Sequence, residues 1–175
     1  MRLFGDERVN YKIGDIIVHW SYGIGTVVAI DQKNIAGVTQ EYYVVEVERF
    51  KFWVPIEEAN EGSIRFPTES IQFEALFDIL RMPGECLPDH QYQRKIALRE
   101  RMQKEKTLED LCHVIRDLTD RSRQNTLNQN DSSVLMRAEE HLLDEWVLSL
   151  GAERSNAMHE LEVLLQGDPS KLKDR

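Results

Sequence analysis

The chain has 175 residues, of which 41% are hydrophobic and 30% are charged. This composition excludes an intrinsically disordered chain with too few apolar residues to form a core. The net charge of -9 excludes a protein that coats nucleic acid indiscriminately, so any such contact must come from a local patch. No apolar run reaches the roughly 18 residues that span a bilayer, and the start MRLFGDERVNYK lacks a signal-peptide core. We therefore expect a cytoplasmic protein without membrane contact.

The N-terminal third predicts β-strands. The apolar segments DIIVHW (15–20) and TVVAID (26–31) flank the break SYGIG, and glycine reaches positive φ without steric cost, so a hairpin is expected there. EYYVVEVE (41–48) and KFWVP (51–55) predict two more strands, with Ala36-Gly37 marking a second hairpin turn. Parallel strands need long crossovers, which are missing, so we expect a small, strongly bent antiparallel sheet or partly open barrel.

After Pro67 the hydrophobic period becomes helical. Phe73, Leu76, Phe77 and Leu80 recur at spacings of three and four, and Pro83-Gly84 ends that segment. Thr107, spaced from Asp110 as in a capping box, starts another helix. Further helices are expected at about 88–102, 131–150 ending at Gly151, and 155–166 ending at Gly167.

The predicted fold class is α+β, with a small N-terminal antiparallel β module followed by an all-α bundle of about five helices. The expected domains are residues 1–68 and 69–167, followed by a flexible tail at 168–175.

Catalytic and metal motifs with useful specificity are missing. The glycines of GIG (23–25) are too few for a dinucleotide fingerprint. His141 and Glu145 stand at helical spacing and could bind a metal ion, and the alternative is an ordinary solvated helix face. Cys86 and Cys112 have no CxxC spacing, so packed thiols are expected over a disulfide. We expect neither an enzyme nor a cofactor or metal.

One segment has a cationic excess. Between His90 and Lys106 six basic residues outnumber Glu100 and Glu105: Arg94, Lys95, Arg99, Arg101, Lys104 and Lys106. Some of them share part of a helix face near Tyr92, while Ile96, Leu98 and Met102 are expected to point towards the bundle. Such a face suits phosphate contacts with stacking or wedging at a distorted duplex, and a solvated helix face is the alternative.

The β module suggests a protein partner. An exposed sheet edge accepts a partner's strand through main-chain hydrogen bonds. Trp53 stands beside Lys51 in KFWVP, and Lys33 and Ile35 lie on the presumed hairpin arm. Packing of Trp53 in the core is the alternative.

These residues resemble a known family. GDIIVHWSYGIGTVVAI is similar to the N-terminal signature of CarD-like (CdnL-type) bacterial transcription regulators, whose Tudor-like module is shared with the transcription-repair coupling factor. The resemblance continues in EYYVVEVE, VPIEEA (54–59) and Ile64-Arg65, and covers about residues 10–166. The positions matching the family's pattern are Gly14, Asp15, Val18, Gly23, Gly25, Val27 and Ile30, then Arg116, Asp117, Leu118, Leu127, Ala138 and Glu145.

The resemblance implies a non-enzymatic, monomeric regulator. Its β module would dock on the RNA polymerase β subunit through Lys33, Ile35, Lys51 and Trp53. Its helical domain would modulate open-complex stability through weak, polymerase-dependent contacts with upstream-fork promoter DNA. The candidates for that contact are Tyr92, Arg94, Lys95, Arg99 and Arg101. The alternative is a protein-only adaptor that docks on polymerase without touching DNA.

The sequence departs from the family at three places. Trp20 replaces a usual proline, and the family's DNA-wedging tryptophan falls at Gln91 or Tyr92. Asp131, Ser132 and Ser133 replace basic residues of some members.

Overall fold

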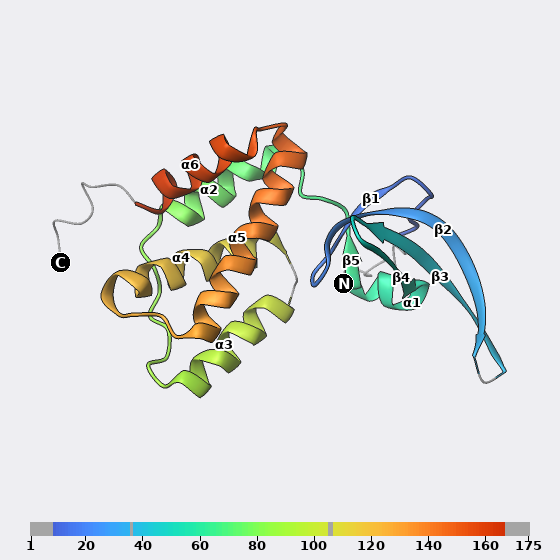
Figure 1. The fold of residues 1–175 in the computed structure, drawn as a ribbon, viewed down its shortest axis with the longest axis horizontal. Coiled ribbons are helices and arrows are strands. Elements are labelled where there is room, and N and C mark those ends of the chain that lie inside the picture. Colours follow the sequence, from blue (N-terminus) through green and yellow to red (C-terminus); the bar gives the residue numbers. More distant parts are fainter. Residues whose placement is uncertain (1–8, 36, 105–106, 167–175) are drawn as a thin grey trace, which may run out of the picture. The chain divides into compact units, whose positions relative to one another are not determined.

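The computed structural model describes residues 9–35, 37–104 and 107–166, and the chain divides into two compact units, Met1–Pro67 and Thr68–Arg175 (Figure 1). The first unit is built on an antiparallel sheet and the second is built of helices, which confirms the predicted α+β arrangement. The predictions for Ala36, for Gly167 and for the tail at 168–175 lie outside the described residues, as do the side chains at 60, 61, 103 and 104.

Five strands form the sheet in the spatial order β4-β3-β2-β1-β5, and every neighbouring pair is antiparallel. Four of them contain the predicted segments. The fifth is two residues long, too short for an alternating pattern to reveal it. The strands are β1 (Ile16–His19), β2 (Gly23–Ile35), β3 (Val38–Val47), β4 (Phe50–Pro55) and β5 (Ile64–Arg65).

The two glycines of SYGIG serve different purposes. Gly23 has φ +75° and opens β2 opposite His19, so it is the residue that needs the left-handed region. Gly25 instead allows close packing, because a Cβ there would lie 2.7 Å from Val45 Cγ1 and 2.9 Å from the Glu46 carbonyl oxygen. Gly37, with φ +83°, lies between β2 and β3.

A β-bulge in β2 decides which side chains face outward. Val27 pairs with Val45 and Ala29 pairs with Val44, so Val28 is an extra residue in β2. A bulge shifts the alternation by one, and odd-numbered residues therefore face opposite sides before and after it. Val27 consequently lies in the core, whereas Lys33 lies on the other face.

One face of the sheet carries the hydrophobic cluster of the first unit. Tyr11 covers part of it, donating its hydroxyl to the Ile64 carbonyl oxygen at 3.0 Å and packing edge-on against Tyr43. A segment that the strand pattern does not predict, α1 (Ile56–Glu58) and a π-helical turn (Ala59–Ser63), connects β4 to β5. The buried cluster is Tyr11, Ile17, Val27, Tyr43, Val45, Val54, Ala59 and Ile64.

The second unit contains the five expected helices. Thr107 caps α4 through a capping box with Asp110, and Gly151, with φ +64°, ends α5, as predicted. The core centres on Trp146, whose ring lies 4.4 Å from that of Phe77. A single 3₁₀ turn (Ser70–Gln72) precedes α2 (Phe73–Arg81), and the others are α3 (Gln91–Lys104), α4 (Leu108–Gln124), α5 (Gln129–Leu150) and α6 (Arg154–Leu165).

We expect Gly25→Ala to lower the free energy of unfolding of the first unit by about 1–3 kcal/mol, since the new methyl group would overlap Val45 and the β3 backbone. Urea unfolding followed by tryptophan fluorescence measures this change. Val38→Ala, at a position 67% exposed, is the control and should stay within about 0.5 kcal/mol of wild type. Equal stability of the two variants would contradict this account of Gly25.

Candidate functional site

One face of the sheet carries all the residues predicted to contact RNA polymerase. They are Lys33, Ile35, Lys51 and Trp53. Each pairs with an even-numbered residue of β3, respectively Gln40, Val38, Glu46 and Val44. Because alternate residues of a strand share a face, the four side chains lie on the side opposite the buried Tyr43 and Val45. We call this side the outer face.

Trp53 is held by contacts on the outer face. Its Nε1 donates to Asp31 Oδ2 at 3.2 Å, and Lys33 Nζ lies 3.7 Å from the centroid of its ring. The indole is 43% exposed, so the alternative of Trp53 in the core is wrong. A cation over the face of an indole is an attractive arrangement, and here it holds the lysine against the ring.

The tip of the β2–β3 hairpin adds an apolar contact. Ile35 and Val38 are cross-strand neighbours, 59% and 67% exposed. Pairing with β4 ends at Tyr42, so the hairpin beyond this residue pairs only with itself among the described residues, as its long curved ribbon shows in Figure 1. Lys51, on the edge strand β4, forms an ion pair of 3.1 Å with Glu46.

An aromatic cluster, which the sequence pattern does not predict, closes the other end of the sheet. His19 stacks on Tyr22 with centroids 4.6 Å apart and meets Phe52 edge-on at 5.1 Å. Its Nδ1 accepts from the backbone N–H groups of Ser21 and Tyr22, which fixes the turn. Trp20 lies beside His19 with the ring centroids 6.1 Å apart.

Arg94 faces the interior of the helical unit, and its predicted place on an exposed cationic face is wrong. It is 4% exposed, and its Nε donates to Asp131 Oδ2 at 2.7 Å. Its Nη1 donates to the carbonyl oxygens of Pro88 and Asp89, both at 2.8 Å. Asp131 is thus the buried partner that neutralises Arg94.

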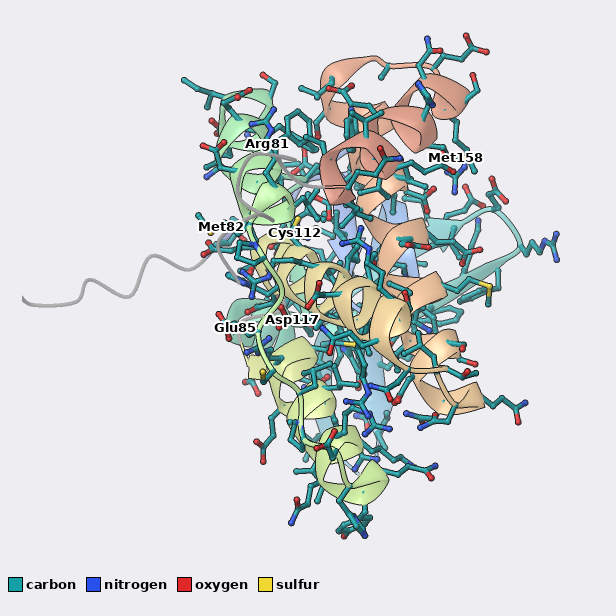
Figure 2. All side chains as sticks on the ribbon, turned by 90° about the vertical axis from the view of Figure 1, so that its left-hand side faces the viewer. Arg81, Met82, Glu85, Cys112, Asp117 and Met158 are labelled. Atoms are coloured by element: carbon teal, nitrogen blue, oxygen red, sulfur yellow. The ribbon has the colours of Figure 1, made fainter. Side chains whose placement is uncertain are left out.

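Arg101, whose side chain is 36% exposed, is also paired within this unit. It donates to Asp117, which in turn accepts from Arg116 Nε at 2.7 Å and from the backbone N–H of Glu85 at 2.8 Å. Figure 2 shows Glu85 and Asp117 beside one another, where the segment after α2 runs along α4. Hydrogen bonding from Arg116, and next from Arg101, lowers the pKa of Glu85. This network connects α3 and α4 with the segment between α2 and α3.

The exposed side of α3 carries the remaining candidates. Tyr92 is 67% exposed, and Lys95 and Arg99 are exposed without an ion pair to any residue in the described part of the chain. Ile96, expected to face the bundle, is 37% exposed, which overturns that prediction, whereas Leu98 is buried as expected. Three of the five DNA candidates are therefore exposed, whereas Arg94 is buried and Arg101, whose side chain is 36% exposed, is ion-paired with Asp117 and Glu85.

The described residues contain no group of three or more His, Cys, Asp and Glu side chains able to hold a metal ion. Of the two residues considered as a metal pair, His141 and Glu145, Glu145 is buried and accepts a hydrogen bond from the Thr68 backbone N–H. Burial lowers the pKa of His141. Cys86 and Cys112 are both free, so the disulfide alternative is wrong; burial raises the pKa of the Cys112 thiol to about 12. Within the described ranges, no helix is both long and apolar enough to span a membrane.

Comparisons with known proteins match both units. A family model described as the CarD-like/TRCF RID domain matches residues 11–66, and one described as the CarD C-terminal domain matches residues 75–162. The Bacillus subtilis (strain 168) protein named "Putative transcription factor YdeB" is 24% identical over 137 residues, which are 77% of this chain and 89% of that protein.

We expect Arg94→Met to lower the free energy of unfolding of the helical unit by about 3–5 kcal/mol, because Asp131 would remain as an uncompensated buried charge. Chemical unfolding followed by circular dichroism measures the change. Arg99→Met, on the exposed side of the same helix, is the matched control, with an expected effect within about 0.5 kcal/mol. If both variants lose the same stability, the buried pair does not have the role assigned to it.

Proposed function

The chain belongs to the CarD-like family and is a transcription regulator, and from this premise we propose that it docks on the β subunit of RNA polymerase and modulates promoter open complexes. The observation that carries the proposal is the outer face, on which Lys33, Ile35, Lys51 and Trp53 gather from two non-adjacent strands. The second unit, in this proposal, meets upstream-fork DNA through α3.

The composition of the outer face supports a protein partner. Interfaces concentrate their binding energy in a few buried aromatic and cationic side chains, surrounded by contacts that exclude water. Trp53 with Lys33 provides such an anchor, and Ile35 with Val38 provides apolar surface at the hairpin tip. The anchor also lies on an edge strand, where a partner can add its own strand by main-chain hydrogen bonds.

Contact with DNA is proposed for Tyr92, Lys95 and Arg99. Arg94 and Arg101 are better assigned to holding α3, since each is paired with a buried aspartate. Two phosphate contacts give a weak and salt-sensitive attraction, with a logarithmic salt slope of about -2. Because the chain has a net charge of -9, α3 alone would bind DNA weakly. Docking on polymerase would raise the local concentration of α3 at the promoter.

The second candidate function is an adaptor that docks on polymerase and does not touch DNA. The internal pairing of Arg94 and Arg101 favours it, because this pairing leaves fewer cations for phosphates than the sequence suggests. The two functions share the polymerase contact and differ only in the use of α3.

We expect Trp53→Ala to weaken binding of the full-length protein to the isolated polymerase β lobe about tenfold or more, because the anchor ring and the packing of Lys33 are both lost. Titration calorimetry or a quantitative pull-down measures this. Ile71→Ala, at an 83% exposed position in the helical unit, is the control and should bind like wild type. Undiminished binding of both Trp53→Ala and Ile35→Asp would refute docking through the outer face.

We expect the double variant Lys95→Glu/Arg99→Glu to bind the β lobe normally and to shift the open-complex lifetime to the value measured without the protein. Reversing both charges turns phosphate attraction into repulsion. Decay of heparin-challenged complexes on several promoters gives the lifetime, with charge reversal at the exposed Arg137 of α5 as control. A lifetime like that of wild type on every promoter would establish the adaptor.

A further inference from the structure

We propose that the two units are joined by a hinge with one free torsion, the ψ angle of Pro67, and that Glu145 is the positioning residue on its helical side. The division of the chain into two compact units falls between Pro67 and Thr68. The peptide groups before and after Pro67 are each bound to the unit on their own side. The inference applies to both functions proposed above and does not rest on either.

The peptide group before Pro67 is held by the sheet unit. The Phe66 ring packs on that of Tyr11 with the centroids 4.9 Å apart. The Phe66 carbonyl oxygen accepts a hydrogen bond from Arg65 Nη1 at 3.1 Å. Tyr11 is itself buried, and its hydroxyl donates to the carbonyl oxygen of Ile64. Ring and carbonyl together therefore fix the plane of the peptide group between Phe66 and Pro67.

The peptide group after Pro67 is held by the helical unit. The Thr68 backbone N–H donates to Glu145 Oε2 at 3.0 Å, and Glu145 is 1% exposed. A carboxylate is a strong acceptor for a backbone N–H group. The next residue, Glu69, is held as well, because it forms a capping box with Gln72 ahead of α2. This second peptide plane is therefore fixed to α2 and α5.

Only the φ and ψ angles of Pro67 separate these two peptide planes. The pyrrolidine ring locks φ at about -65°, so ψ is the torsion that stays free. At this φ, ψ has two favourable regions, that of the α-helix and that of polyproline II, which lie about 180° apart. The hinge therefore has two preferred settings rather than a continuous range. Once the sheet unit is docked, the setting of Pro67 decides where α3 can reach.

Backbone ¹⁵N relaxation of the full-length protein tests the anchor at Glu145. We expect an order parameter of about 0.85 for the Thr68 amide in the wild type and a value below about 0.6 in Glu145→Ala. Glu145→Gln should keep the wild-type value, because its amide oxygen still accepts the hydrogen bond. Glu140→Ala, at an exposed position of the same helix, is the matched control. A purely structural role of Glu145 would instead raise mobility along the whole of α5, which would overturn its assignment.

Two further variants test the hinge without removing a core residue. Phe66→Ala, at a 49% exposed position, should lower the order parameter of the residue 66 amide, because the contact with Tyr11 is lost. Pro67→Gly should leave Thr68 ordered and shorten the rotational correlation time of both units, because it frees φ as a second torsion. A mobile Thr68 amide in the wild type, or unchanged correlation times in Pro67→Gly, would overturn the inference.

Discussion

The bulge at Val28 is the constraint on which the outer face depends. The pairing of β2 with β3 buries Val27 on one side of the bulge and turns Lys33 and Ile35 away from the core on the other. The register between β3 and β4 has no such shift, so Trp53 stays on a fixed side of the sheet. Without the extra residue, Lys33 would point to the opposite face from the indole it now covers.

The sequence predicts the regular elements of both units, because their signals are local. Alternating apolar residues mark four strands, Thr107 marks the start of α4, and Gly151 marks the end of α5. It does not predict the bulge, since Val28 stands inside the continuous apolar run TVVAI, with no glycine or proline to mark it. It also does not predict β5, because a strand of two residues is too short to show an alternating pattern of apolar and polar residues.

The site on α3 is predicted only in part, since its orientation is set by residues distant in sequence. Arg94 is one of several cations in its segment, and its charged partner in the interior, Asp131, lies 37 residues later in the sequence. The side of α3 that packs on the rest of the unit carries the buried Arg94 and Leu98 and the ion-paired Arg101, so apolar periodicity alone does not identify it. Ile96 is left on the surface for the same reason, and the polar pairs rather than hydrophobicity decide which side of the helix meets solvent.

The buried pair of Arg94 and Asp131 also restricts how the sequence can diverge. A basic residue in place of Asp131 would bring two positive charges close together in the interior, which would strongly destabilise the folded state. The two positions must therefore mutate in concert along a lineage, and compensatory exchange at one is expected wherever the other changes sign.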